Sequence, residues 1–323
     1  MKTNCINCVT TLTSRLGLAL LAALLLNVTV TFAAEPTLKP AASVKDIVLS
    51  GDAKCTKCHD ETDDYPVLAI GKTRHGVAAD NRTPTCTSCH GDSKSHIDKP
   101  EGAKERPKTE RNFGKKATTT AAVQNGACLT CHQSGARMNW QGSQHQSADV
   151  PCAACHQVHT GKDKVLAKAT QPETCFACHK EQRAQFNRAS SHPILEGKVS
   201  CSSCHNPHGA VGPKQLVKNT FNETCYTCHT EKRGPFLWEH PPAREDCSNC
   251  HVPHGSIHTP LLKARAPWLC QECHVAQFHP STAYSGTGIP PRGAAQQVLA
   301  NSCMNCHSQV HGSNHPSGAR KTR

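Results

Sequence analysis

Aromatic and other large apolar residues are scarce in this sequence. Only 4% of its 323 residues are aromatic, and it contains three tryptophans, three tyrosines and three methionines. A conventional hydrophobic core is hard to build from this composition, because a domain of this size depends on buried apolar side chains for its stability. We therefore expect something other than side chains to supply apolar bulk in the interior.

The one long apolar run, residues 16–30, lies near the N-terminus. It is too short for a comfortable membrane span, which needs about 20 residues. Lys2 and Arg15 precede it and small residues follow it, as in a secretory signal peptide. We predict a signal peptide over residues 1–33 and an N-terminal linker over residues 34–54. In a Gram-negative cell the exported chain would reach the periplasm.

Cysteine, by contrast, is abundant, and 20 of the 22 cysteines fall in ten copies of C-x-x-C-H. This motif is the attachment signature of c-type haem, so we predict ten covalently bound haems. The two remaining cysteines, Cys5 and Cys8, stand in CINCV, where valine replaces histidine, and we predict no eleventh haem. The predicted haem-attaching residues are Cys55, Cys58, Cys86, Cys89, Cys128, Cys131, Cys152, Cys155, Cys175, Cys178, Cys201, Cys204, Cys225, Cys228, Cys247, Cys250, Cys270, Cys273, Cys303 and Cys306.

The spacing within the motif suits haem attachment. Positions i, i+3 and i+4 share one face of a helical turn, so two thiols can meet one porphyrin edge while the histidine reaches the iron. Zinc sites and redox-active dithiols also use C-x-x-C, but neither they nor a disulfide framework explain a histidine after every pair. The predicted proximal iron ligands are His59, His90, His132, His156, His179, His205, His229, His251, His274 and His307.

Twelve further histidines can supply the sixth iron ligands. A repeated pattern, with one histidine between two motifs and one just after the second, selects His75, His96, His145, His159, His192, His208, His240, His254, His279 and His311. It leaves His258 and His315 as spares. Methionine is nearly excluded, since Met1 is removed with the signal peptide and Met304 lies inside a motif. Ten bis-histidine irons would have no free position for a substrate, which indicates an electron carrier and no enzyme.

His208 illustrates why these histidines must bridge between haems. It follows His205 by three residues, which span at most about 10 Å when extended. Pro207 also ends the helical turn of the motif. A path around the porphyrin rim to the opposite face of the same haem is longer than this. We therefore predict that His208 binds the iron of a neighbouring haem.

Internal repeats organise the chain by pairs of motifs. Residues 173–209 match residues 223–255, and each copy holds two motifs and two additional histidines. We expect a multihaem cytochrome c fold, mostly irregular with short α-helices and little or no β-sheet, in an elongated chain wrapped around ten haems. A division into a first haem group, residues 55–190 with haems 1–5, and a second, residues 191–323 with haems 6–10, is predicted. The polar stretch 95–120 is interpreted as a solvated loop.

The formal charge of +12 does not indicate nucleic-acid binding. Ten haems bring about twenty propionates, so the holoprotein is expected to be near neutral when oxidised and acidic when reduced. No nucleic-acid partner is predicted.

The chain resembles the periplasmic decahaem c-type cytochromes of the MtrA/DmsE family. The resemblance rests on the ten motifs, on the opening GDAKCTKCHDETDDYPVLAIGKTRHG and on the closing CMNCHSQVHGSNHPSG, and it covers nearly all of the mature chain. It implies a molecular wire of bis-histidine haems partly inside an outer-membrane β-barrel porin of the MtrB type. It also implies electron donors among periplasmic or inner-membrane cytochromes, and an outer-surface multihaem cytochrome or terminal reductase as the next partner.

The resemblance implies a role in extracellular respiration or in metal oxidation or reduction, and relatives work in either direction. One alternative is a freely diffusing periplasmic shuttle or electron store, which needs the same haems. Another is a multihaem reductase, but the sequence has no CxxCK motif and has enough histidines to close every iron.

Overall fold

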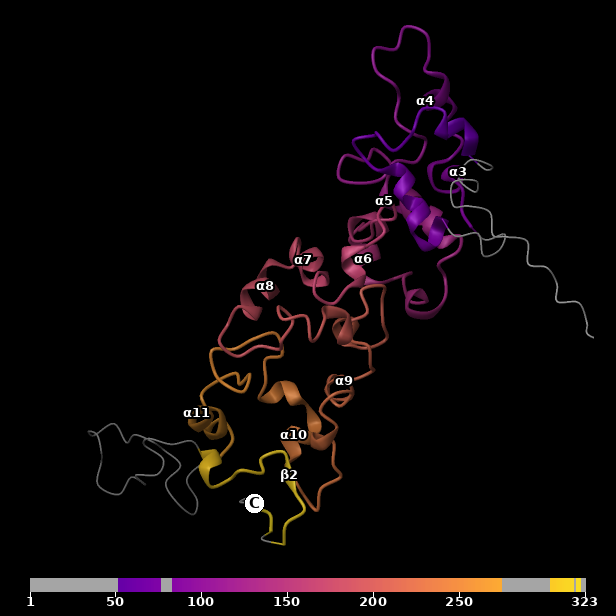
Figure 1. Ribbon diagram of the computed structural model, residues 1–323. Coiled ribbons are helices and arrows are strands. Elements are labelled where there is room, and N and C mark those ends of the chain that lie inside the picture. The colour runs from indigo at the N-terminus through magenta and orange to yellow at the C-terminus, as the bar shows by residue number, and fades with distance from the viewer. Residues whose placement is uncertain (1–51, 77–82, 275–302, 317, 321–323) are drawn as a thin grey trace, which may run out of the picture. The chain divides into compact units, whose positions relative to one another are not determined.

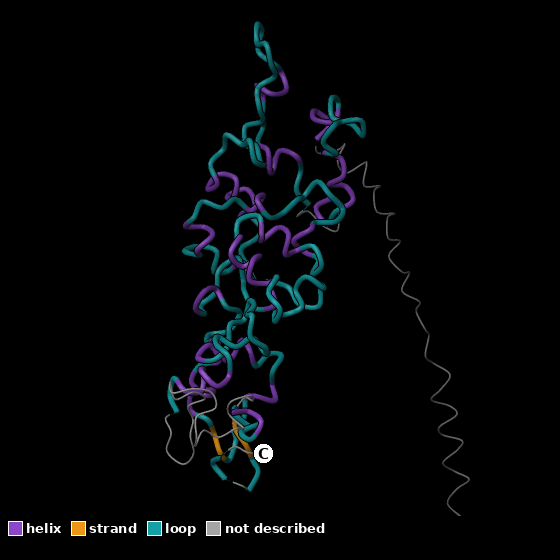
Figure 2. Tube along the Cα trace, turned by 90° about the vertical axis from the view of Figure 1, so that its left-hand side faces the viewer, coloured by secondary structure: helices purple, strands orange, loops and turns teal. Residues whose placement is uncertain are grey.

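The computed structural model describes residues 52–76, 83–274, 303–316 and 318–320, all of which belong to one compact unit, residues 42–323. The predicted signal peptide and His279 lie outside the described residues. In the described part, loops join short helices throughout, and two short strands form the sheet (Figures 1 and 2). This confirms the predicted mostly irregular fold with short helices. The boundary predicted near residue 190 stays a prediction.

The regular elements are short. The α-helices are α3 (Cys86–His90), α4 (Lys94–Asp98), α5 (Ala121–Leu129), α6 (Gln144–Ser147), α7 (Gln171–Phe176), α8 (Lys180–Phe186), α9 (Phe221–Cys225), α10 (Pro241–Glu245) and α11 (Ala266–Gln271). The 3-10 helices are η1 (Val67–Lys72), η2 (Arg74–Gly76), η3 (Gly135–Arg137), η4 (Cys152–Ala154), η5 (Lys164–Leu166), η6 (Cys201–Ser203), η7 (Pro213–Gln215), η8 (Thr230–Lys232), η9 (Cys247–Asn249) and η10 (Cys303–Asn305). The strands are β1 (Trp238–Glu239) and β2 (Gly312–Ser313).

In the second to fifth pairs the two motifs begin differently, whereas in the first pair the second motif is the α-helix α3. An α-helix leads into the first motif, as α9 leads into Cys225, and its start is capped by the Thr220 side chain, which accepts from the Glu223 amide at 3.1 Å. The second motif of the same pair is a single 3-10 turn, η9. Helices α5, α7 and α11 lead into motifs in the same way, and η4, η6 and η10 are the matching turns.

The strands join segments that are distant in sequence. β1 and β2 are antiparallel, with Trp238 opposite Ser313 and Glu239 opposite Gly312. An isolated bridge between Ser190 and Ser256 repeats this arrangement, with backbone hydrogen bonds of 3.0 and 2.8 Å. In both cases each bridging segment carries one of the predicted distal histidines two residues away, so the bridges align histidines from different repeats.

Side chains alone form little core in the described residues. The main cluster of buried apolar side chains consists of Phe176, Phe186 and Ile194, with Val199 packed against them. No large side chain in the described part is fully buried. Within the same residues, no helix is both long enough and apolar enough to cross a membrane. The described side chains therefore supply little apolar bulk themselves, and its supply by bound groups stays a prediction.

Candidate haem-binding sites

Each CxxCH motif folds into one tight turn, as its spacing requires. In nine motifs the amide of the histidine donates to the carbonyl of the first cysteine at 2.9–3.1 Å. The remaining motif, Cys86–His90, forms α3. This hydrogen bond is that of an α-helical turn. It places both thiols and the imidazole on the same side of the backbone.

Nine of the ten proximal histidines face a second histidine ring. The pairs, with the proximal residue first, are His59–His96, His90–His159, His132–His75, His156–His208, His179–His145, His205–His254, His229–His192, His251–His311 and His274–His240. Every second member is one of the predicted distal ligands. The tenth predicted distal residue, His279, lies outside the described residues, as stated above.

The separation of the rings fits a metal ion between them. All nine centroid distances lie between 5.9 and 6.3 Å, whereas the angle between ring planes varies from 3° in His59–His96 to 89° in His132–His75. Direct ring packing would couple the distance to the angle. A histidine nitrogen bonds a metal ion at about 2.0–2.1 Å and lies roughly 1 Å from its ring centre, so two imidazoles on opposite sides of one ion have centres about 6 Å apart. The residues present therefore fit a haem iron at each pair.

Hydrogen bonds orient the imidazoles through Nδ1. The Nδ1–H groups of His96, His145, His159, His192 and His240 each donate to a backbone carbonyl at 2.7 Å. A carbonyl only accepts, so the proton is on Nδ1 and the lone pair is on Nε2. Such second partners fix the tautomer and the orientation of metal-binding histidines. The proximal residues His90, His205, His251 and His307 donate to carbonyls in the same way.

Two proximal histidines have carboxylate partners instead. Nδ1 of His59 lies 2.9 Å from Asp63, and Nδ1 of His156 lies 2.8 Å from Asp163. A carboxylate partner raises the basicity of a ligating imidazole more than a carbonyl does, because it stabilises the proton on Nδ1 by charge. The side chain of Asp163 is 10% exposed, so solvent screens this pair weakly.

Burial favours the neutral form of several of these imidazoles. It is the largest cause that lowers the pKa of His90, His132, His208, His251, His254 and His311. Burial disfavours the charged form of histidine, and a neutral imidazole has the free lone pair that a metal requires.

His208 faces His156 and not His205, in agreement with the limit set by its spacing. The rings of His156 and His208 are 6.0 Å apart and 13° from parallel, whereas His205 faces His254 at 6.0 Å. The His208 ring also packs near Trp140, at 6.5 Å. Its Nδ1 is buried and has no hydrogen-bond partner among the described residues.

The pairing follows one rule along the chain when the motifs are numbered 1–10. A histidine that follows an even-numbered motif faces the preceding even-numbered motif, as His159, His208, His254 and His311 do for motifs 2, 4, 6 and 8. A histidine that follows an odd-numbered motif faces the next odd-numbered one, as His75, His145, His192 and His240 do for motifs 3, 5, 7 and 9. His96 follows motif 2, has no earlier even motif available, and faces motif 1.

The attaching thiols of successive motifs lie next to one another. Within a pair the first cysteines interact, as in Cys175 and Cys201, where a hydrogen bond lowers the pKa of Cys201 to about 7 and raises that of Cys175. The same contact joins Cys55 to Cys86, Cys128 to Cys152, Cys225 to Cys247 and Cys270 to Cys303.

Between pairs the second cysteines approach each other instead. Burial and then the charge of Cys178 raise the pKa of Cys155, and Cys228 acts in the same way on Cys204. For Cys250 the pKa is raised first by burial, and Cys273 is among the further causes. Between motifs 2 and 3, burial and then the charge of Cys128 raise the pKa of Cys89, and Cys131 is a further cause. Cysteines of successive motifs therefore interact all along the described chain, so the attachment points follow one another in sequence order.

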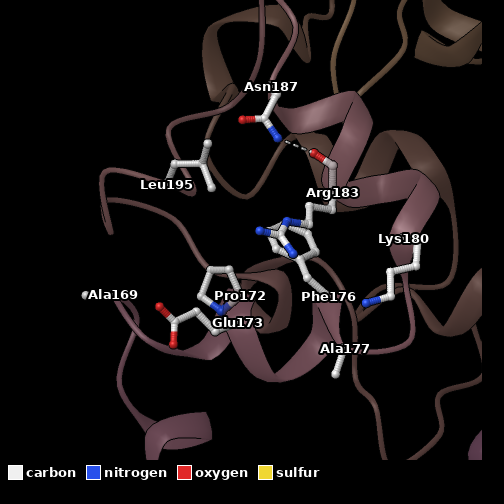
Figure 3. A pocket seen from close by; sticks show the side chains of 9 residues that line it. All are labelled: Ala169, Pro172, Glu173, Phe176, Ala177, Lys180, Arg183, Asn187 and Leu195. Atoms are coloured by element: carbon white, nitrogen blue, oxygen red, sulfur yellow. Dashed lines mark hydrogen bonds between the residues drawn. The ribbon is translucent and has the colours of Figure 1, made fainter.

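A pocket of about 500 Å³ lies beside α7 and α8 (Figure 3). Its lining includes Phe176 and Ala177, the two variable residues of the motif CFACH, together with Lys180, Arg183 and Leu195. No thiol or imidazole lines it. The pocket is therefore not where the motif holds its haem.

The loop between motifs 2 and 3 does more than was expected of a solvated segment. The carbonyl of Pro107 accepts from His96 Nδ1 at 2.7 Å, and the carbonyl of Arg111 accepts from His90 Nδ1 at 3.0 Å. Two predicted ligands therefore depend on this loop for their orientation. Sequence reasoning missed this role because the acceptors are backbone atoms, which leave no residue signature.

Comparisons with known proteins agree with this geometry. Residues 192–234 and 240–279 match the family model described as a doubled CXXCH motif, and residues 86–170 match the model of NrfB-like c-type cytochrome proteins. The multiheme cytochrome MtrA of Shewanella baltica (strain OS185) is 47% identical over 274 residues, which cover 83% of this chain and 80% of that protein. The chain therefore belongs to the family of multihaem c-type cytochromes that includes MtrA, proteins of electron transfer.

Proposed function

We propose that this chain is a decahaem electron carrier in which each iron is held between two histidines. The observation that carries the proposal is the nearly constant separation of 5.9–6.3 Å in nine proximal–distal ring pairs. We assign one haem to each of the ten motifs, with the cysteines and histidines given in the sequence analysis as its attachment sites and ligands.

The side chains hold the iron and keep other ligands away. Two imidazoles would hold the iron of each bound haem and would leave it no position for a substrate, so the chain would act as an electron carrier and not as an enzyme. Aromatic rings shield individual ligands, with Tyr65 edge-on to His159, Phe113 edge-on to His90 and Phe186 against His254. Bound haem supplies a reversible one-electron couple at each site.

The interactions between cysteines of successive motifs support transfer in sequence order. First cysteines interact within pairs, and between pairs the second cysteine of one pair interacts with a cysteine of the next, so consecutive attachment points are neighbours along the described chain. A path that visits the motifs from 1 to 10 therefore has no long step at its attachment points. This supports a wire in preference to ten isolated centres.

We further propose that the chain works in the periplasm, in association with the outer membrane. The predicted signal peptide and the relationship to MtrA support this location. In this proposal a porin-type β-barrel of the MtrB type holds the carrier, periplasmic or inner-membrane cytochromes donate or accept electrons at one end, and an outer-surface multihaem cytochrome or terminal reductase does so at the other. The direction of flow is left open.

Low-temperature EPR of the oxidised holoprotein, with haem quantified in parallel, tests the electron-carrier proposal. We expect ten haems per chain and low-spin ferric signals alone. The angle between axial imidazole planes controls the g anisotropy, so near-parallel pairs such as His59–His96 and near-perpendicular pairs such as His132–His75 should give distinct signals. A stoichiometric high-spin signal would contradict the proposal and indicate an open site, as in a multihaem reductase.

Isolation from membranes tests the proposed partner. We expect the chain to co-purify in mild detergent with a β-barrel protein, and the complex in liposomes to reduce an enclosed acceptor from an external donor. Vesicles with the barrel alone are the control. Recovery of the chain in the soluble periplasmic fraction without a barrel would instead favour a diffusing shuttle.

A further inference from the structure

A polar side chain before the first motif of a pair recurs in four pairs and reaches the second motif. Asp52 accepts from the amides of Cys86 and Thr87, the latter at 3.4 Å. Asn125 accepts from the Cys152 amide and Asn222 from the Cys247 amide, both at 2.7 Å, and Gln171 accepts from the Ser202 amide at 2.9 Å. All four side chains belong to buried residues. They connect the two motifs of each pair.

Asp52 differs from the other three residues in charge. Asn125 and Asn222 also donate through Nδ2, to Val150 at 3.1 Å and to Arg244 at 2.9 Å, which is the behaviour of a neutral amide. Asp52 only accepts, and its residue is 2% exposed. Three residues before its first cysteine, the first pair thus has a carboxylate where the second and fourth pairs have an asparagine, and the third pair has the amide of Gln171 one residue earlier. In the last pair Pro267 stands three residues before the first cysteine, as Asp52 does in the first.

The Asp52 carboxylate lies at the attachment points of the first two haems. One of its oxygens and the sulfur atoms of Cys55 and Cys86 all lie within 4.8 Å of one another. Its charge acts on both sulfurs, since after burial it raises the pKa of the Cys55 and Cys86 thiols. Solvent screens a charge in this position weakly.

We propose that the buried Asp52 carboxylate lowers the reduction potentials of the haems attached at motifs 1 and 2 relative to those of the pairs with an amide at this position. Oxidised haem carries one more positive charge than reduced haem, so a nearby negative charge stabilises the oxidised form. The first pair is then a low-potential end of the chain. The inference rests on haem attachment at Cys55 and Cys86, and it does not depend on the partner or on the direction of flow.

The substitution Asp52→Asn removes the charge and keeps an acceptor of the same shape. In a spectroelectrochemical titration of the holoprotein, we expect about two of the ten electron equivalents to move to higher potential. At a fixed potential within the range where these two haems titrate, the ratio of reduced to oxidised haem at motifs 1 and 2 should rise about tenfold, equivalent to 59 mV for one electron. Asp92→Asn is the matched control, because that carboxylate is exposed and its loss should leave the titration unchanged.

The reciprocal variant Asn222→Asp keeps the test decisive if Asp52→Asn disturbs folding. It places a carboxylate beside Cys225 and Cys247, and we expect two electron equivalents to move to lower potential. The inference is overturned if Asp52→Asn, with ten haems and unchanged EPR signals, titrates like the wild type. It is also overturned if Asn222→Asp leaves the titration unchanged. A haem count below ten in the wild-type chain would instead contradict the proposed function.

Discussion

The histidines show how a single side chain is prepared for a metal at the residue scale. A backbone carbonyl that accepts from Nδ1 directs Nε2 toward the facing imidazole, and this arrangement occurs in proximal and distal residues alike. His208 is different, because its orientation depends on packing near Trp140 and on the ring of His156. Its Nδ1 has no partner within the described part of the chain. The described residues therefore give the buried Nδ1 of His208 no hydrogen bond to hold the ring in place.

Replacement of His208 by alanine tests its assignment. We expect His208→Ala to keep ten haems but to convert one of them to the high-spin ferric state, and to allow carbon monoxide to bind one haem per chain after reduction. The physical reason is that motif 4 loses its sixth ligand while its thioether bonds and His156 remain. EPR and carbon monoxide titration measure both effects.

His258→Ala provides the control for this substitution. His258 also follows a motif closely, but it faces no proximal ring among the described pairs and was predicted as a spare. The substitution His258→Ala should leave all haems low-spin. A high-spin signal in His258→Ala, or none in His208→Ala, would contradict the ligand rule.

The bridges between distant segments operate at the scale of elements. His192 and His240 donate to the carbonyls of Pro253 and Val310, each of which immediately precedes another distal histidine. One segment thereby orients two histidines that serve different motifs. Gly255, which follows His254, permits a close approach between this segment and α8, since a Cβ at Gly255 would overlap the carbonyl oxygen of Gln185.

Substitution of Gly255 by alanine should therefore push the segment that carries His254 away from α8. We expect a loss of about 1–3 kcal/mol in stability from the forced backbone shift. A high-spin signal from motif 6 is also expected, because His254 immediately precedes this residue. Thermal unfolding followed by circular dichroism and EPR of the same sample measure the two effects.

Gly126→Ala is the matched control for the glycine substitution. Gly126 lies inside α5, where no atom is within 4 Å of an added Cβ. Alanine should be neutral there or stabilise the helix by up to about 1 kcal/mol. Equal destabilisation by both substitutions would show that the close contact at Gly255 is not the cause.

At the scale of the whole molecule, the pairing rule links motifs two apart and must change at each end. At the N-terminal end His96 faces motif 1, since no earlier even-numbered motif exists. By the same rule, the histidine after motif 9 has no motif 11 to serve. His279 follows motif 9 in the sequence, and we predict that it is the distal ligand of the iron at motif 10, whose proximal ligand is His307.

Two single substitutions distinguish the candidates for motif 10. We expect His279→Ala to produce one high-spin haem and His315→Ala to produce none, because the end rule assigns the sixth ligand to the histidine after motif 9. EPR with haem quantification is again the measurement. The opposite result would make His315 the ligand and limit the end rule to the N-terminal end.

The ten CxxCH motifs and the tight turn of each could be predicted from sequence because they are local, whereas the assignment of haems and distal ligands to them stays a prediction. Two thiols and a histidine at i, i+3 and i+4 need only one turn of backbone to form a site, so Cys201, Cys204 and His205 could be assigned without a fold. The short helices were predictable for a related reason. A chain that wraps bound groups does not need long amphipathic elements.

Only the tertiary structure decided which distal histidine faces which motif. His208 could be excluded from its own haem by chain length, but its partner His156 belongs to an earlier repeat, and several motifs were within reach. The carbonyls that orient the rings and the charge of Asp52 at the first pair were equally hidden. Such contacts join residues 62 or 34 positions apart, and they depend on how repeats cross in space, which spacing along the chain does not specify.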